Sequence, residues 1–122
     1  MILVDTSVWI DHLRKPDSML ARLLEEARIV THPFIIGEIA LGSLKNRKLI
    51  LTSLAGLPAA IVASDEEVLS HIDAAGLAGA GIGYLDAHLL ASAKLTSGAR
   101  IWTRDNKLRS AAIAAGVAAA MM

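Results

Sequence analysis

Short, largely apolar runs alternate along the chain with longer segments in which apolar positions recur every three to four residues. The short runs are typical of strands buried on both faces, and they are Ile2–Val4, Ile29–Thr31, Ala60–Val62, Ile101–Thr103 and a candidate edge strand from Val117 onward. Capping residues, prolines and glycines mark the ends of the longer segments, which we expect to be helices. The expected helices run from Thr6 or Ser7 to Leu13, from Asp17 or Ser18 to about Ala27, from Pro33 to about Leu44, from about Arg47 to Ala55, from Ser64 to near Gly76, from Tyr84 to Ser97 and from Asn106 to Ala115.

This alternation predicts an α/β fold with three layers, α/β/α, around a central parallel sheet of four to five short strands. The chain has 122 residues, which is enough for one well-packed domain and too few for two of ordinary size. The sequence has no linker, low-complexity tract or internal repeat. We therefore expect a single domain over residues 1–122.

Charge and cysteine content narrow the functional class. Twelve basic and twelve acidic side chains cancel, so the binding of a polyanion must come from local basic patches. The chain has no cysteine, which excludes disulfides and thiolate metal sites and fits a reducing compartment. No basic-then-apolar leader opens the chain, and the longest uncharged run, Leu49 to Ser64, contains Gly56 and Pro58. We expect a cytoplasmic protein without a membrane segment.

Four acids carry the candidate chemistry. Asp5, Glu38 and Asp86 each stand alone in apolar surroundings, and Asp105 follows the last expected internal strand. An unpaired carboxylate in such a setting is costly unless a counter-charge neutralises it. Ligands in open α/β sheets bind at the carboxyl ends of the strands, where Asp5 and Asp105 fall. We expect Glu38 and Asp86 early in helices that begin at the same edge.

Four carboxylates at one edge suggest one shared divalent cation. Oxygen ligands without thiolates favour Mg²⁺, with Mn²⁺ as a substitute. Such a site suits attack of an activated water on a phosphodiester. The chain's four histidines show no spacing typical of a competing metal site, and they are His12, His32, His71 and His88.

Each acid also has a purely structural alternative. Asp5 and Asp105 precede helices and could cap them, and Arg104 or Lys107 could pair with Asp105. Glu38 could be buried with a distant basic partner. Asp86 lies in the first turn of its helix, where the helix dipole would stabilise its negative charge.

At these residues the chain resembles the PIN-domain family, specifically VapC-type toxins of bacterial toxin–antitoxin pairs. Four segments in order carry the resemblance: Ile2-Leu3-Val4-Asp5-Thr6-Ser7-Val8-Trp9-Ile10, Ile36-Gly37-Glu38, Ile82-Gly83-Tyr84-Leu85-Asp86-Ala87-His88-Leu89-Leu90-Ala91 and Trp102-Thr103-Arg104-Asp105. They span the whole chain. The family usually has an aromatic residue shortly after the fourth acid, where this chain has Leu108; we interpret this as a change in packing.

The resemblance implies a PIN-like domain that acts as a metal-dependent endoribonuclease and leaves a 5′-phosphate. Carried over by motif, the Mg²⁺ ligands would be Asp5, Glu38, Asp86 and Asp105. Thr6 and Thr103 would orient these ligands or the phosphate. The family also implies a homodimer and inhibition by a small cognate VapB-type antitoxin, which in some members places a basic side chain in the acidic pocket.

Surface features suggest where RNA and partners would bind. Candidate RNA contacts are the basic residues Arg14, Lys15, Lys45, Arg47, Lys48 and Arg104; ordinary solvated helix ends are the alternative. We expect exposed apolar residues on the first two helices, including Trp9, Leu20, Leu23 and Leu24. One helical stripe there, Leu20, Leu23, Leu24 and Ala27, either only packs on the sheet or, as the resemblance suggests, also accepts the antitoxin's helix in a groove. The helix from Tyr84 to Ser97 is a candidate dimer surface.

Other functions fit the pattern less well. A phosphorylation-receiver domain needs two adjacent acids after its first strand, and a dehalogenase-type phosphatase needs an aspartate where Ser7 stands. The glycine loop Gly79–Gly83 precedes a helix but follows no strand, so it is a weak nucleotide-binding motif. A catalytically inactive PIN-like RNA-binding module remains an alternative. The presence of all four acids favours the active nuclease.

Overall fold

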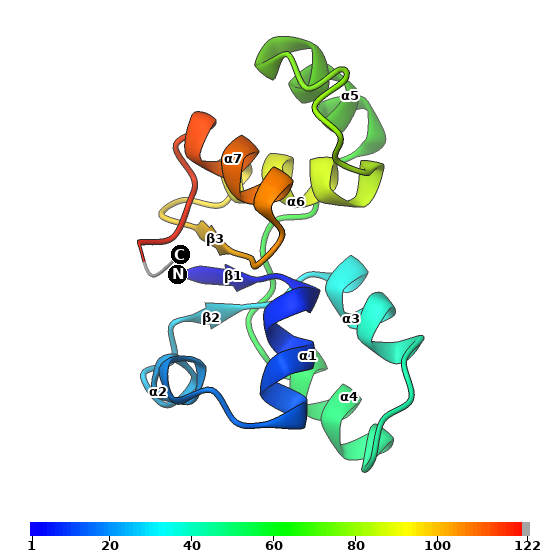
Figure 1. Ribbon diagram of the computed structural model, residues 1–122, viewed down its shortest axis with the longest axis vertical. Helices are drawn as coiled ribbons and strands as arrows, with labels where there is room; N and C mark the ends of the chain where they lie inside the picture. Colours follow the sequence, from blue (N-terminus) through cyan, green and yellow to red (C-terminus); the bar gives the residue numbers. More distant parts are fainter. Residues whose placement is uncertain (121–122) are drawn as a thin grey trace.

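The computed structural model describes residues 1–120, and Figure 1 shows its strands crossing the middle of an elongated molecule. Helices α1–α4 gather toward one end of the long axis and α5–α7 toward the other. The elements in chain order are β1 (Ile2–Val4), α1 (Thr6–Arg14), α2 (Ser18–Glu25), β2 (Ile29–Val30), α3 (Pro33–Ala40), α4 (Arg47–Ala55), α5 (Asp65–Ala75), α6 (Tyr84–Leu95), β3 (Arg100–Trp102) and α7 (Asn106–Ala114). The expected α/β/α architecture is thus confirmed.

The sheet has three parallel strands in the order β2-β1-β3. In the central strand, Leu3 lies opposite Val30 on one side and Ile101 on the other. Two isolated parallel bridges extend the sheet, Thr31 to Ala59 and Ile101 to Ala118. The expectation of a strand at Ala60–Val62 was wrong, because pairing beside β2 is limited to one bridge and then ends. The candidate edge strand after Val117 is likewise a single bridge within the described residues.

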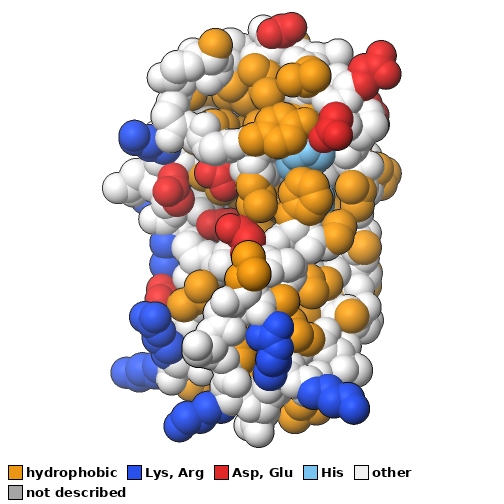
Figure 2. All heavy atoms as spheres, turned by 90° about the vertical axis from the view of Figure 1, so that its right-hand side faces the viewer, with side chains coloured by type: hydrophobic (Ala, Val, Ile, Leu, Met, Phe, Trp, Pro, Cys, Tyr) orange, Lys and Arg blue, Asp and Glu red, His pale blue; other side chains and the backbone are white. Residues whose placement is uncertain are grey.

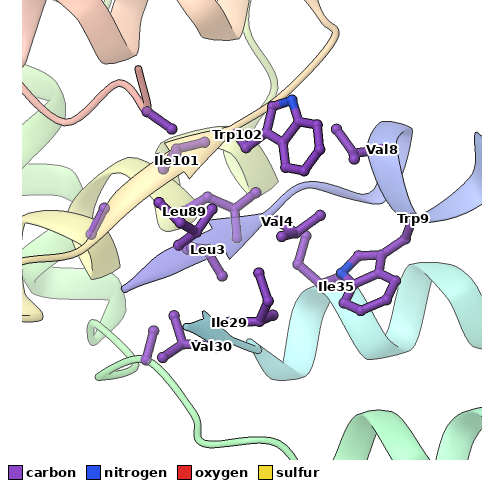
Figure 3. Close-up of a cluster of buried hydrophobic side chains, with 14 of the residues drawn as sticks. Leu3, Val4, Val8, Trp9, Ile29, Val30, Ile35, Leu89, Ile101 and Trp102 are labelled. Atoms are coloured by element: carbon purple, nitrogen blue, oxygen red, sulfur yellow. The ribbon is translucent and has the colours of Figure 1, made fainter. Parts of the chain in front are cut away.

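The core lies on both faces of β1 and joins the two groups of helices (Figure 3). Leu3 and Val4 have no exposed surface, as expected for a central parallel strand. The expectation of exposed apolar residues on the first two helices was wrong for Trp9, Leu20 and Leu23, which are buried in this core. The helical stripe of α2 therefore packs inside the molecule and is not a free groove.

Local signals explain where several helices begin and end. Asp17 caps α2 by accepting a hydrogen bond from the Leu20 backbone N–H. Ser64 begins α5 with the expected capping box. Helix α3 ends at Ala40, earlier than the expected Leu44, since the stretch after it contains a glycine and a serine, which favour helix poorly.

Helix α6 forms the buried axis of the second group of helices. Its residues from Ala87 to Ala93 are all buried, so the expected dimer surface is not available along most of this helix. It ends at Leu95 because Thr96 turns to an extended conformation and its hydroxyl accepts from the Ile61 N–H at 2.8 Å. With 12 residues α6 is the longest described helix. No helix within residues 1–120 is long and apolar enough to cross a membrane.

Candidate active site

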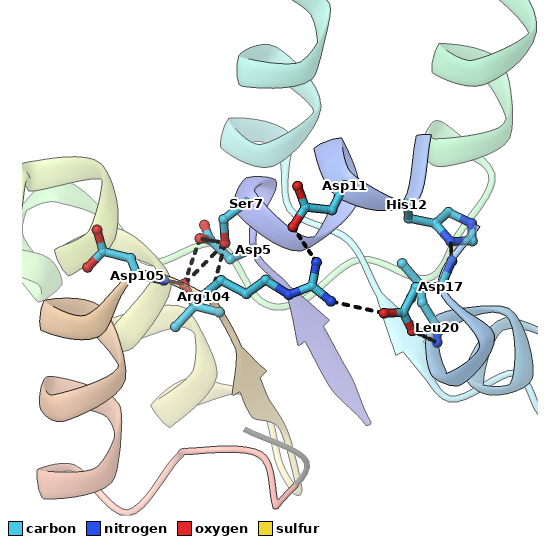
Figure 4. Close-up of polar contacts among 9 residues, drawn as sticks. Asp5, Ser7, Asp11, His12, Asp17, Leu20, Arg104 and Asp105 are labelled. Atoms are coloured by element: carbon cyan, nitrogen blue, oxygen red, sulfur yellow. Dashed lines mark hydrogen bonds and ion pairs between the residues drawn. The ribbon is translucent and has the colours of Figure 1, made fainter. Parts of the chain in front are cut away.

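Asp5 leaves the carboxyl end of β1 and is the most buried of the four acids, with 7% of its surface exposed. Its backbone N–H donates to the Trp102 carbonyl at 2.9 Å, which joins the ends of β1 and β3. The hydroxyls of Ser7 and Thr103 each donate to its Oδ2 at 2.8 Å. Asp5 occupies the N-cap position of α1 but makes no capping side-chain bond, so its carboxylate is held by hydroxyls and faces the site (Figure 4).

Glu38 reaches the site from helix α3. It is the sixth residue of an eight-residue helix, so the expected position early in the helix was wrong. Its Oε1 accepts a hydrogen bond from the Thr6 hydroxyl at 2.7 Å. Thr6 begins α1 directly after Asp5, and this bond therefore ties the second acid to the first.

Asp86 lies in the first turn of α6, where it was expected. Burial raises its pKa to about 6, and the negative charges of Asp5, Asp105 and Glu38 add to this increase. A backbone hydrogen bond from Gly83 acts in the opposite direction. The charges of Asp5, Asp105 and Glu38 thus all act on the Asp86 carboxylate.

Asp105 follows β3 and caps α7 by accepting from the Leu108 N–H at 2.8 Å. Its own N–H donates to the Thr103 hydroxyl at 3.1 Å. Asp105 therefore does cap a helix, as its structural alternative predicted. Its other carboxylate oxygen makes no hydrogen bond within residues 1–120. Of the two basic residues that could pair with it, Arg104 turns away toward other acids (Figure 4).

Arg104 binds two carboxylates outside the site. Its guanidinium contacts Asp11 of α1 and, at 2.9 Å, Asp17 at the start of α2. It also lies over the Trp102 ring, 5.8 Å from the centroid. The backbone hydrogen bond from Leu20, and after it the Arg104 guanidinium, hold the pKa of Asp17 below its usual range. The arrangement disfavours the expected contact of Arg104 with RNA.

The four acids fit a hard divalent cation in the chemistry of their donors. All are carboxylates, two are oriented by hydroxyls, and their shared negative potential raises the pKa of Asp86. Within residues 1–120, however, no three acidic or histidine side chains converge closely enough to form a complete ligand set. The acids thus share a field without forming a compact coordination shell.

A cleft of about 430 Å³ borders the site at Glu38. Arg14 from α1 and Lys45 from the loop before α4 line the same cleft, so the fold brings the two expected basic clusters together. Lys15, Arg47 and Lys48 are exposed. Figure 2, which views the edge at the carboxyl ends of the strands, shows acidic side chains at mid-height with basic ones below them.

Sequence reasoning missed the direct contact of Ser7 with Asp5. The Ser7 hydroxyl also accepts from the Arg104 backbone N–H at 3.1 Å, so it joins the start of α1 to the loop after β3. It was considered only as a helix cap. A hydroxyl two residues after a strand-end acid was the available signal, since a side chain at that distance can turn back to the carboxylate.

The comparisons with known proteins agree with this arrangement. The PIN domain family model matches residues 2–114. The chain is also similar to "Ribonuclease VapC32" of Mycobacterium tuberculosis, in strains CDC 1551 / Oshkosh and ATCC 25618 / H37Rv. Each pair is 48% identical over 120 residues, which cover 98% of this chain and 97% of the relative. The chain belongs to the PIN domain family.

Proposed function

We propose that this protein is a metal-dependent endoribonuclease and the toxin of a VapBC-type pair. The observation that carries the proposal is the coupling of Asp86 to the other three acids, since a shared negative field at a strand edge is what a divalent cation would offset. The 48% identity to a named ribonuclease over nearly the whole chain supports RNA as the substrate.

The four acids share one role in this proposal. Asp5, Glu38, Asp86 and Asp105 would hold Mg²⁺, or Mn²⁺ in its place. When bound, the cation supplies Lewis-acid activation of the phosphodiester and of the attacking water. Thr103 and Ser7 keep the Asp5 carboxylate in one orientation, and Thr6 does the same for Glu38. Fixed carboxylates lose little conformational entropy when they engage a ligand.

Basic residues around the cleft would bind the RNA backbone. Arg14 and Lys45 line the cleft that reaches Glu38, and Lys15, Arg47 and Lys48 lie exposed close to them in sequence. Cations that neutralise phosphates beside the acids would offset the repulsion between the RNA and the site. Arg104 is omitted from this set because Asp11 and Asp17 already neutralise it.

A cognate VapB-type antitoxin would inhibit the enzyme from the same cleft. Its lining includes Ile10, Leu13, Leu44 and Ile50 together with Glu38. These features suit an amphipathic helix whose basic residue meets the acidic site. A homodimer and a cytoplasmic location remain predictions that follow from the family.

RNA cleavage by purified protein tests the proposal. Wild-type protein in millimolar Mg²⁺ should cut RNA internally, and Asp5→Asn should abolish cutting while its circular dichroism spectrum stays unchanged. Asp73→Asn, a change of an exposed acid on α5, is the matched control and should cut normally. Undiminished cleavage by Asp5→Asn would exclude the proposed site.

A further inference from the structure

The few aromatic residues of this chain divide sharply between the core and the site. The chain has two tryptophans, one tyrosine and one phenylalanine. Trp9 and Trp102 are buried, whereas Tyr84 is 46% exposed and Phe34 is partly exposed. Tyr84 begins the helix that carries Asp86, and Phe34 lies in the first turn of the helix that carries Glu38. Both aromatic rings that reach solvent thus belong to helices of the site.

The Tyr84 ring is fixed although it is exposed. Its hydroxyl donates to Asp65 Oδ1 at 2.7 Å, and the same oxygen lies 3.0 Å from His88 Nε2. The Tyr84 ring and the His88 imidazole are perpendicular, with centroids 4.7 Å apart, and the Phe34 ring also contacts the histidine, at 4.6 Å between centroids. Because His88 is only 3% exposed, it anchors both rings to the protein.

A small hollow lies beside this ring. It has a volume of about 260 Å³ between the end of α5 and the start of α6, and its main apolar walls are Ile72, Leu77, Ile82 and Tyr84. Gly79 and Gly83, in the glycine loop before α6, also line the hollow. A Cβ atom placed on either glycine would meet no heavy atom within 4 Å, so the space there is open.

We infer that this hollow binds one unstacked nucleobase of the RNA substrate, with the base stacking on Tyr84. The inference rests on the proposed ribonuclease function and adds a base-binding subsite to it. Sequence-tolerant recognition of single-stranded RNA depends on stacking between bases and aromatic side chains. Tyr84 supplies such a ring in the first turn of α6, which also carries Asp86. Residues two apart lie on different faces of a helix, so the RNA backbone would pass around the start of α6 between the base at Tyr84 and the acids.

The dimensions and the surroundings favour a base over other occupants. The volume is below the range typical of drug-sized ligands, which leaves room for one flat ring system. A second copy of this chain would need roughly 800 Å² of contact per partner, far more than such a hollow offers. On the strand-end face, hydrophobic side chains lie beside acidic ones (Figure 2). The hollow is lined by Tyr84 at the start of α6, the helix that also carries Asp86.

Binding to short single-stranded RNAs, measured in the cleavage-deficient Asp5→Asn background, tests the inference. Tyr84→Ala should weaken binding about tenfold, the effect typical of losing one stacked base, and Tyr84→Phe should restore most of the affinity. Removing the base at one RNA position should abolish the difference in affinity between the parent protein and its Tyr84→Ala variant. Leu69→Ala, which removes an exposed apolar side chain of α5, should bind like the parent.

One further variant separates base stacking on the Tyr84 ring from a structural role of Tyr84. Asp65→Ala removes the tie to the Tyr84 hydroxyl but keeps the ring, so affinity should fall by about twofold at most. A loss as large as that of Tyr84→Ala would assign Tyr84 a purely structural role and overturn the inference. A Tyr84→Ala protein that binds every abasic RNA tenfold more weakly, or that changes its oligomeric mass instead of its RNA affinity, would also overturn it. Failure of wild-type protein to cut RNA would instead refute the proposed function.

Discussion

Replacing Asp86 with asparagine should stabilise the protein when no divalent cation is bound. Asparagine keeps the shape of the side chain but removes the charge that burial and three neighbouring acids oppose. A carboxyl whose pKa is higher in the native state than in the unfolded chain destabilises the fold once it ionises. This loss of stability is absent at low pH, where Asp86 is protonated in both the folded and the unfolded protein. It develops as the pH rises from about 4, where the unfolded chain ionises, to about 6, where the folded protein ionises.

The magnitude follows from the pKa. A rise from 3.8 to about 6 corresponds to roughly 3 kcal/mol at about 1.4 kcal/mol per unit. Asp86 is only partly buried, and solvent screening reduces this figure to on the order of 1–2 kcal/mol. For a domain of this size, that difference raises the melting temperature by about 4–8 °C.

Thermal unfolding in chelator between pH 4 and pH 8 measures the effect. The melting temperatures of wild type and Asp86→Asn should coincide near pH 4 and separate progressively, with the full difference above pH 7. Asp73→Asn controls for the loss of one negative charge from the surface and should follow wild type. A difference that does not change with pH, or an Asp86→Asn protein that is less stable at pH 7, would refute the reasoning.

Three further predictions concern the same edge of the sheet. Millimolar Mg²⁺ should raise the melting temperature of wild type through binding to the native state and should raise that of Asp5→Asn much less; equal shifts would argue against a shared site. Thr103→Val removes a buried hydroxyl bonded to the Asp5 carboxylate and should cost roughly 1.5–3 kcal/mol in urea unfolding, whereas Thr103→Ser should restore most of it. Neutralising Lys45, Arg47 and Lys48 together should flatten the salt dependence of RNA binding and leave the Mg²⁺-induced stabilisation intact; an unchanged slope would place the RNA elsewhere.

The sequence was sufficient to predict the strand ends at which Asp5 and Asp105 lie. They follow β1 and β3, which pair in parallel, so both lie at the same edge of the sheet. The position of Glu38 could not be predicted in the same way. It lies late in α3, and its approach depends on how α3 packs against α1, which is a tertiary contact without a local signal.

The burial of the α2 stripe also depends on tertiary contacts that have no local signal in the sequence. Hydrophobic periodicity predicts which face of a helix is apolar, but it does not say whether that face meets a partner or the protein's own core. Leu20 and Leu23 are buried in the core, so of the two alternatives for the stripe the structure supports packing inside the protein. The central position of α6 likewise depends on contacts with α5, α7 and β3.

Arg104 illustrates why neighbours in sequence are a poor guide to charge balance. It directly precedes Asp105, yet its guanidinium neutralises Asp11 and Asp17 on the other side of the loop. Within residues 1–120, no ion pair joins a basic side chain to any of the four acids. Their negative field therefore remains uncompensated by the protein, which is why neighbouring carboxylates contribute to the raised pKa of Asp86. A fold in which Arg104 pairs with Asp11 and Asp17 and not with the adjacent Asp105 preserves the negative field that would attract a divalent cation.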